Sequence, residues 1–527
     1  MSGEGGALSA AWAHLPDYLG WHVLLSLSAL LIGVGISLPL ALVSLRSRTL
    51  RGAALGFASV VQTIPGLALL ALFYPLLLAV SAFTRASFGI GFRALGFLPA
   101  LFALALYAML PVLRNTVAGI ENVDPAVKRA AIGVGMTRLQ SLRLVELPLA
   151  APVILAGIRI AAVWVIGAAT LSTPVGQTSL GNYIFSGLQT ENWVSVLFGC
   201  VAAALLALVV DRLLALAETG LVRRSRARFA GALAGLVLLF GASLVSFAGG
   251  GVERPVVVGT KGFEEQYILG ALIEDRLRKG GIPTARRDGL GSTVIFDALA
   301  AGDIDVYVDY SGTVWADDMK RRDQPPRQVL LDEMCAWLAR MRGIRCVGPL
   351  GFENAYAFAM RADRARALGI RSLADLARYA PRLKIGGDYE IFGRPEWRAV
   401  ESAYGLRFGT ERQYQANFLY RAVASGDVDV ISAFSSDGRI AQYGLRILSD
   451  PKRALPPYDA VLLVSPVHGH DARLIAALKP LVGAISLSVM QRANLMADRD
   501  IDKLAPEAIA AWLDASIGAH GGRDSRN

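Results

Sequence analysis

The sequence predicts a two-part protein, with an α-helical membrane domain of about six spans followed by a two-lobed α/β domain. At 527 residues the chain is too long for one ordinary domain. Before about residue 250 the apolar runs are long and charges are sparse, whereas after it charges are frequent and apolar runs are short. The second part also alternates short β-rich runs with helical patterns, which is typical of an α/β fold. We therefore expect a membrane domain over 1–250 and a soluble domain over 251–527.

Apolar runs of about 18 residues or more indicate membrane-spanning helices. The first part contains six such runs, at 21–45, 54–82, 95–119, 149–171, 193–216 and 229–249. Pro65 and Pro111 interrupt the second and third runs, which membrane helices tolerate when neighbours satisfy the freed carbonyl groups. Arg159 lies near the start of the fourth run, and we expect its guanidinium to extend to the cytoplasmic side.

The basic residues predict the orientation of the spans, because short cytoplasmic loops are enriched in arginine and lysine. They concentrate in three gaps, at 46–51, 128–143 and 223–228, which we place inside. The N-terminus and the soluble domain then lie outside. We expect a multi-pass protein of the bacterial cytoplasmic (inner) membrane, with no cleavable signal peptide because the first twenty residues lack a basic region. The net charge of +10 does not indicate nucleic-acid binding, since no basic patch interleaves with stacking aromatics.

The gap at 124–148 resembles the EAA loop of bacterial ABC importer permeases, in which a short cytoplasmic helix docks onto an ATPase subunit. Its Ala-Ala, Gly and Leu-Pro positions match, but Arg129 replaces the usual Glu and Val145 the usual Ile. Asp124 and Pro125 read as an N-cap and first helical residue. The alternative is an ordinary amphipathic helix resting on lipid headgroups. The resemblance implies that the ATPase-coupling residues are Arg129, Ala130, Ala131, Gly135, Leu147 and Pro148.

Two further segments, 62–70 and 106–116, resemble signatures of permeases in the osmoprotectant uptake family. That family imports glycine betaine, choline, carnitine and related compounds, and the resemblance implies a type I ABC permease. A P-loop needs Gly-x4-Gly-Lys-Ser/Thr, and no lysine in this chain follows a glycine. We therefore expect no ATPase activity and no cofactor in this chain, with ATP and Mg²⁺ bound by a separate ATPase subunit.

The soluble part is expected to form two lobes joined by a hinge, as in periplasmic binding proteins. We assign 254–352 and 458–518 to lobe one and 353–457 to lobe two. Expected strands include 256–258, 306–308, 383–385 and 428–431, with a helix over 264–279 and largely parallel pairing. The sequence AGDIDV at 301–306 is echoed by SGDVDV at 425–430. Each reads as a helix end, a glycine turn and a strand whose tip reaches the cleft, once from each lobe.

Nearly all of 254–515 resembles the osmoprotectant binding proteins, through segments at 259–267, 289–293, 305–313, 352–357, 432–438 and 456–460. Matched positions imply an aromatic cage of Tyr310, Tyr356, Phe434 and Tyr458, with Gln266 and Thr313 as polar partners. A quaternary ammonium has no N–H to donate, so aromatic faces bind it by about 0.5–2 kcal/mol each. The family usually has Tyr where Phe434 stands. The alternative is that these rings are lobe core.

Some neighbouring residues are weaker candidates. Asp309 could add a counter-charge to the cage, and Asn354 and the loop 388–394 could line the cleft mouth. Cys335 and Cys346 are both expected outside the cytoplasm, where disulfides persist, and could pair. His468 and His470 are expected to be solvated rather than to bind a metal, and no metal site is expected.

Together these features predict an ABC importer subunit that combines permease and solute receptor and takes up a quaternary-ammonium compound such as glycine betaine, choline or carnitine. We expect a homodimer in the bilayer with two ATPase subunits. One alternative is import of ergothioneine or another cationic amine with the same layout. Another is a ligand-sensing membrane receptor without transport, although a sensor does not need a helix that docks an ATPase.

Overall fold

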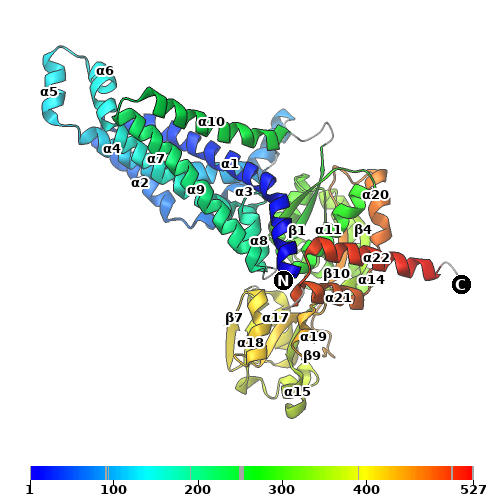
Figure 1. Ribbon diagram of the computed structural model, residues 1–527. Helices are drawn as coiled ribbons and strands as arrows, with labels where there is room; N and C mark the ends of the chain where they lie inside the picture. The colour runs from blue at the N-terminus through cyan, green and yellow to red at the C-terminus, as the bar shows by residue number, and fades with distance from the viewer. Residues whose placement is uncertain are drawn as a thin grey trace. The chain divides into compact units, whose positions relative to one another are not determined.

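In the computed structural model the chain forms two compact units (Figure 1), a membrane unit of Gly6–Leu188 and Trp193–Arg254 and a binding unit that contains Pro255–Asn527. The structure describes residues 2–89, 92, 94–189, 192–248, 254–389, 391–499 and 503–524. Within this part, six helices are long and apolar enough to cross a membrane, which confirms the predicted number of spans.

In its described residues the membrane unit contains ten α-helices. They are α1 (Ser2–Ser44), α2 (Arg48–Thr63), α3 (Gly66–Phe88), α4 (Phe97–Glu121), α5 (Pro125–Gly133), α6 (Arg138–Ser141), α7 (Leu147–Ala169), α8 (Gly181–Gln189), α9 (Trp193–Val222) and α10 (Arg226–Ala248). A π-helical turn, Leu142–Glu146, joins α6 to α7, and a 3₁₀ turn, Thr170–Val175, follows α7.

The predicted second span over 54–82 is wrong as a single helix. The chain leaves the helix at Ile64, which has an extended ψ of 127°, so that α2 ends at Thr63 and α3 begins at Gly66. Proline at position 65 disfavours the α conformation of the residue before it, which is the physical reason for the break. Of the two helices, only α3 is long enough to span.

Pro111 leaves α4 continuous, because another helix satisfies the group that the proline frees. A proline at 111 cannot donate to the carbonyl of Tyr107, one turn earlier. Gln62 Nε2 donates to that carbonyl at 3.4 Å. The Tyr107 hydroxyl in turn donates to the carbonyl of Ile64. The two segments that resemble the permease signatures therefore bind each other.

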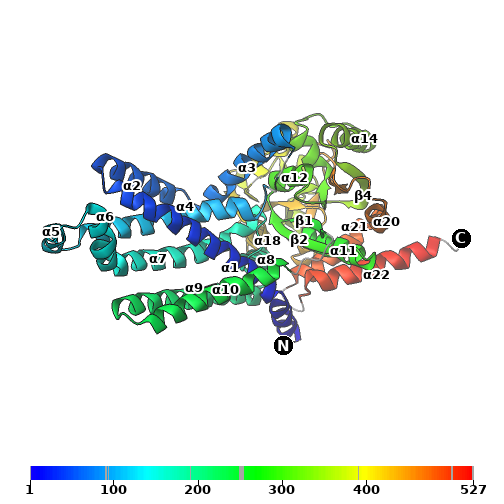
Figure 2. The ribbon, with the colours of Figure 1, turned by 90° about the horizontal axis from the view of Figure 1, so that it is seen from above.

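The core of the membrane unit is the contact between α4 and α7, with α9 between α7 and α10 (Figure 2). Arg159 of α7 makes a bidentate ion pair with Asp211 of α9 at 2.9 and 3.0 Å, and its third nitrogen is 2.9 Å from Glu218. Carboxylates on the neighbouring helix neutralise the guanidinium, as charges within membrane spans require. The expectation that it extends to the cytoplasmic side stays a prediction.

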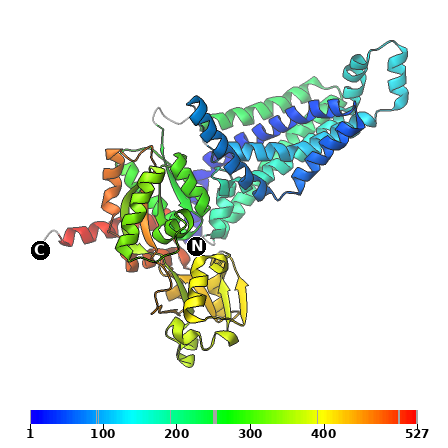
Figure 3. The same cartoon turned by 180° about the vertical axis from the view of Figure 1, so that it is seen from behind.

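The described residues of the binding unit form two five-stranded sheets, one in each lobe. The sheet of the first lobe has the order β2-β1-β3-β10-β4, and that of the second lobe has the order β7-β6-β8-β5-β9 (yellow in Figure 3). The strands are β1 (Val256–Lys261), β2 (Thr284–Leu290), β3 (Val306–Tyr310), β4 (Arg345–Glu353), β5 (Tyr356–Arg361), β6 (Lys384–Gly387), β7 (Thr410–Gln413), β8 (Val430–Phe434), β9 (Leu445–Leu448) and β10 (Asp459–Val464).

Strand direction differs from the expectation of largely parallel pairing. The pairs of β1 with β2 and β3 are parallel, as are those of β6 with β7 and β8. However, β10 is antiparallel to β3 and β4, and β5 is antiparallel to β8 and β9. The chain crosses between the lobes twice, at Asn354 and near Tyr458, and β5 and β10 are the strands that directly follow these crossings. Each therefore enters its sheet from the opposite end to the parallel strands.

The helices of the binding unit include the predicted one over 264–279. They are α11 (Glu264–Lys279), α12 (Ser292–Ala301), α13 (Ser311–Thr313), α14 (Arg327–Trp337), α15 (Ala362–Leu368), α16 (Leu373–Leu376), α17 (Pro395–Tyr404), α18 (Ala416–Ser425), α19 (Arg439–Gln442), α20 (Ala472–Leu478), α21 (Leu487–Asp498) and α22 (Pro506–Asp524). Two short segments near the cleft are a π-turn, Val314–Asp318, and a 3₁₀ turn, Ile391–Gly393.

The sequence echo has the predicted structure in both lobes. Gly302 (φ 76°) ends α12 before β3, and Gly426 (φ 84°) ends α18 before β8. These left-handed conformations favour glycine. Because the two strands begin at matched positions, Tyr310 and Phe434 occupy the same place, the last residue of β3 and of β8.

The close approach of α4 and α7 gives the first prediction. A Cβ at Gly157 would lie 2.5 Å from the Asn115 Cβ and 2.8 Å from the Pro111 carbonyl oxygen, whereas one at Gly167 of the same helix would meet nothing within 4 Å. We expect Gly157→Leu to lower stability by about 1–3 kcal/mol through overpacking. Gly167→Leu is the control. Thermal unfolding of the detergent-solubilised chain measures both, and equal effects would contradict close packing at Gly157.

Candidate functional site

Three of the four predicted cage rings are in contact where the two lobes meet. Tyr356 begins β5 and pairs across the sheet with Phe434, with ring centroids 5.0 Å apart. Tyr458, directly before β10, meets the Tyr356 ring edge-on at 5.7 Å. Gly312 lies against the Tyr458 ring so closely that a Cβ there would come within 2.7 Å of it. Two of these rings thus come from the sheet of the second lobe, and the third comes from the connection that leads back to the first.

Tyr310, the fourth predicted ring, is fixed at the end of β3 by neighbours of its own. It stacks on Phe263 with a centroid separation of 6.1 Å and an interplanar angle of 29°. Its hydroxyl donates to Glu265 Oε1 at 2.6 Å and accepts from Gln266 Nε2 at 3.0 Å. The phenol is therefore held at its hydroxyl end.

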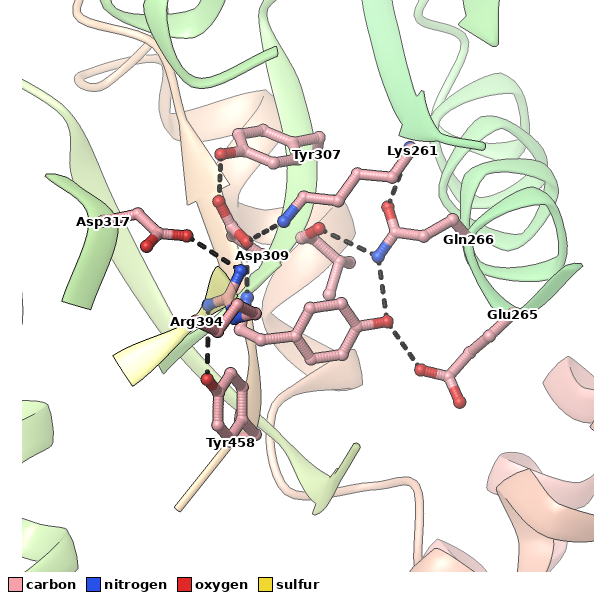
Figure 4. A network of polar contacts seen from close by, with 10 residues as sticks. Lys261, Glu265, Gln266, Tyr307, Asp309, Asp317, Arg394 and Tyr458 are labelled. Atoms are coloured by element: carbon pink, nitrogen blue, oxygen red, sulfur yellow. Dashed lines mark hydrogen bonds and ion pairs between the residues drawn. The ribbon is translucent and has the colours of Figure 1, made fainter. Parts of the chain in front are cut away.

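The two predicted polar partners differ in what their side chains contact. Gln266 accepts from the Lys261 backbone N–H and donates to the Val308 carbonyl and to Tyr310 (Figure 4). Its amide therefore positions the strand ends rather than pointing freely into the cleft. Thr313, buried in α13, makes no hydrogen bond through its hydroxyl to a residue that the structure describes.

Two cations lie among the aromatic residues, and sequence reasoning missed the first. Lys261 Nζ lies 2.5 Å from Asp309 Oδ1 and 5.5 Å from the centre of the Tyr310 ring. Lys261 ends β1, a strand in which all six residues are buried. A lysine that ends an otherwise apolar buried strand was the available signal, because buried lysines are rare unless paired.

Arg394 is the second cation, and the loop 388–394 was expected only at the cleft mouth. Its guanidinium carbon is 5.5 Å from the Tyr356 ring centre, and its nitrogens contact Tyr458 Oη at 3.4 Å and Glu396 at 3.1 Å. It also forms an ion pair with Asp317 of the first lobe at 3.2 Å (Figure 4). Arg394 therefore connects the two lobes across the site.

The connections between the lobes lie side by side at the base of the site. The Asn354 N–H donates to the Tyr458 carbonyl at 2.9 Å. The Ser435 hydroxyl accepts from the Ala355 N–H at 2.9 Å and donates to the Glu353 carbonyl at 3.1 Å. These bonds place the cage residues Tyr356 and Tyr458 next to the segments about which two lobes of this kind can hinge.

Acidic side chains surround the two cations. The Tyr307 hydroxyl donates to Asp309, and the Tyr458 hydroxyl donates to Glu396. Burial, with the nearby Asp309 carboxylate, raises the pKa of Asp318 to about 7. The site thus combines ring faces that contact cations, two cationic groups and several carboxylates, which is an arrangement suited to a charged organic molecule rather than a neutral one.

The EAA-like segment forms the predicted helix, α5, followed by the short α6 at one end of the membrane unit (Figure 1). Asp124 caps α5 by accepting the Ala126 N–H at 2.7 Å, as predicted. Gly135 has φ 81° in the turn between the helices. Of the remaining predicted coupling residues, Arg129, Ala130 and Pro148 are exposed, Ala131 is buried and Leu147 is half-buried.

Elsewhere in the binding unit, Cys335 of α14 and Cys346 of β4 form a disulfide, with Cα atoms 5.4 Å apart. The described residues contain no group of three or more His, Cys, Asp or Glu side chains that could hold a metal ion. His468 lies 3.6 Å from Asp305 and 3.5 Å from Asp471.

Six spans with an exposed EAA-like segment, followed by a two-lobed receptor, define the membrane component of a binding-protein-dependent importer with its receptor in the same chain. Family comparisons agree over both parts. The family described as "Binding-protein-dependent transport system inner membrane component" matches residues 33–223. The family described as "Substrate binding domain of ABC-type glycine betaine transport system" matches residues 254–515.

Relatives match one part or both. "Choline transport system permease protein OpuBB" of Bacillus subtilis (strain 168) is 41% identical over 197 residues, which are 37% of this chain and 83% of that protein. "Ergothioneine transport permease/ergothioneine binding protein EgtU" of Helicobacter pylori (strain G27) is 29% identical over 417 residues, 76% of this chain and 72% of that protein. The chain therefore belongs to the osmoprotectant family of ABC importers, as a permease fused to its substrate-binding domain. It is a multi-pass inner-membrane protein with a periplasmic-type binding domain.

The raised pKa of Asp318 gives the second prediction. The folded binding unit holds this proton more tightly than the unfolded chain, whose aspartate pKa is near 3.8, so the contribution of Asp318 to stability falls as pH rises from about 4 to about 7. This loss of stability amounts to at most about 4 kcal/mol, and we expect Asp318→Asn to abolish it. Thermal midpoints of the binding unit at pH 4, 5.5 and 8 measure it. Asp332→Asn, an exposed carboxylate of α14, should leave the fall unchanged.

Proposed function

We propose that this chain imports a zwitterionic quaternary-ammonium solute of the betaine type, such as glycine betaine, carnitine or ergothioneine. The observation that carries the proposal is the combination of clustered aromatic rings with two cationic side chains in one site. Rings whose faces already lie 5.5 Å from Lys261 and from Arg394 are suited to positive charge. A trimethylammonium group has no N–H, so ring faces rather than hydrogen-bond acceptors would hold it.

The other end of such a solute is a carboxylate, which the cations can bind. Arg394 presents a planar guanidinium that matches carboxylate geometry, and Lys261 supplies an ammonium. The Thr313 hydroxyl is a further donor. Choline has no carboxylate for these cations to bind, so the geometry favours betaines over choline. Within the betaines, ergothioneine is supported by the Helicobacter pylori relative, which matches this chain over both of its parts.

Transport requires energy from another subunit. We propose that an ABC ATPase docks on α5 and α6 and that this chain hydrolyses no ATP itself. An exposed apolar surface on this segment supports the docking, and it is formed by Val127, Ile132, Val134, Leu139 and Leu144. Assembly as a homodimer with two ATPase subunits follows from the family and is part of the proposal. Mass photometry of the purified complex tests the stoichiometry.

Calorimetric titration of the detergent-solubilised chain tests the cargo. The panel is glycine betaine, carnitine, ergothioneine and choline, with glycine as the unmethylated control. We expect at least one betaine to bind more tightly than choline and glycine not to bind. If the folded chain binds no compound of the panel, the quaternary-ammonium assignment is overturned. If it prefers choline, the proposal of a zwitterionic solute is overturned.

The third prediction concerns Arg394. We expect Arg394→Met to weaken binding of the preferred betaine by about tenfold or more, since a charge-assisted bidentate contact is worth about 1.5–3 kcal/mol. Choline, which lacks the carboxylate, should lose much less. Arg398→Met, an exposed arginine of α17, is the matched control. Equal losses for betaine and choline would indicate that Arg394 shapes the site without binding the carboxylate.

The fourth prediction concerns docking of the ATPase. Ile132 of α5 is 68% exposed, and placing a carboxylate there should disrupt an apolar contact with the ATPase. We expect Ile132→Asp to abolish co-purification with a co-expressed family ATPase and ATP-driven uptake into proteoliposomes, while solute binding is unchanged. Val329→Asp, at an exposed valine of the binding unit, should affect neither. Normal uptake by Ile132→Asp would place the docking surface elsewhere.

A further inference from the structure

Glu265, the second residue of α11, is a buried carboxylate directly behind the cage. Its side chain is among the buried acids of the binding unit, with 3% of the residue exposed. It accepts hydrogen bonds from the Tyr310 hydroxyl at 2.6 Å, from Asn354 Nδ2 at 3.1 Å and from Asn494 Nδ2 at 2.9 Å. These donors come from β3, from the lobe connection and from α21, so the carboxylate is held from three directions.

The carboxylates around the cage differ in how they are neutralised. Asp309 is paired with Lys261, and Glu396 is paired with Arg394. Glu265 has only neutral donors and forms no salt bridge within the part of the chain that the structure describes. Burial raises the pKa of Glu265, and the hydrogen bonds donated to it oppose that rise. A carboxylate in the first turn of a helix is also stabilised by the helix dipole.

The Tyr310 hydroxyl carries the influence of this carboxylate to the cage. An O–H that donates to a carboxylate leaves its oxygen more negative, and hydrogen-bonded groups polarise one another in a low-dielectric interior. In a phenol this extra electron density is shared with the ring, whose face then attracts a cation more strongly. The contact is at the edge of the ring and does not itself cover a face of Tyr310. Phe263 stacks on the ring, and Lys261 Nζ lies 5.5 Å from its centre, which shows that the ring already accepts a cation.

We propose that Glu265 is a specificity-determining residue, whose buried negative charge acts through Tyr310 to select a permanently cationic headgroup over an uncharged group of the same shape. This inference rests on the proposed function and deepens it. Glu265 touches no solute, so it is a positioning and polarising residue. The competing interpretation is purely structural, because the same hydrogen bonds also join α11 to the lobe connection and to α21.

A pair of isosteric ligands separates these two roles. Glycine betaine and 3,3-dimethylbutanoate share the carboxylate and three methyl groups, but the second has carbon in place of the ammonium nitrogen. Choline and 3,3-dimethylbutan-1-ol form a second pair. Loss of structure weakens both members of a pair, whereas loss of negative charge weakens only the cation. The preference for the cationic member is therefore the readout.

The experiment is calorimetric titration of the full detergent-solubilised chain with each pair, for wild type and Glu265→Gln. We expect the variant to bind the cation about five- to tenfold more weakly, the scale of a cation–π contact, and its carbon isostere within about twofold of wild type. The matched control is Glu274→Gln, a buried carboxylate of the same helix that is paired with Arg278 at 3.0 Å. It should change neither affinity.

A second variant covers the case in which Glu265→Gln does not fold. Tyr310→Phe keeps the ring and removes the hydroxyl that contacts Glu265, and it should lower the same preference. The two substitutions together should lower it no more than either alone, since they interrupt one path. An unchanged preference in both variants, or equal weakening of both ligands, would overturn the inference. If wild type binds no quaternary-ammonium ligand, the proposed function fails, and this inference fails with it.

Discussion

The binding unit depends on the ion pair between Lys261 and Asp309, because it neutralises a lysine at the end of a fully buried strand. A buried charge without a partner costs several kcal/mol, so the ends of β1 and β3 have to stay together. The other parts of the site follow from this constraint. Gln266 binds the backbone of both strand ends, and it also donates a hydrogen bond to the Tyr310 hydroxyl at the end of β3. Arg394 then meets Asp317 from the other lobe.

The membrane unit satisfies its polar groups in the same way, between neighbouring helices. Arg159 is neutralised by two carboxylates of α9, and the carbonyl that Pro111 frees accepts from Gln62. In both cases the group that needs a partner belongs to a membrane-spanning helix, where an unpaired group would be costly. Polar residues within the apolar spans are thus explained by partners on an adjacent helix, and they contribute to holding the spans in register.

Much of the architecture could be predicted from the sequence, because long apolar runs and the charge distribution are strong signals. The helix over 264–279 and the repeated glycine turns at Gly302 and Gly426 were predicted from local pattern. The direction of β5 and β10 was not, since a short apolar strand has the same pattern whichever way it runs. For the site, resemblance supplied the rings, and the strand pattern could have singled out Lys261. The contacts of Lys261 with Asp309 and of Arg394 with Asp317 depend on long-range folding that no local pattern encodes.

The helix that follows the EAA-like segment has a mechanical consequence. From Arg138 to Val175 the backbone is helical throughout, passing from α6 through the π-turn into α7 and its final 3₁₀ turn. Because the helical backbone is continuous, a displacement of its cytoplasmic end would be transmitted to its far end. At Gly157 it packs tightly against Asn115 and Pro111 of α4, and this contact is placed to act as the pivot. A movement of an ATPase subunit docked at that end would then tilt the span rather than bend it.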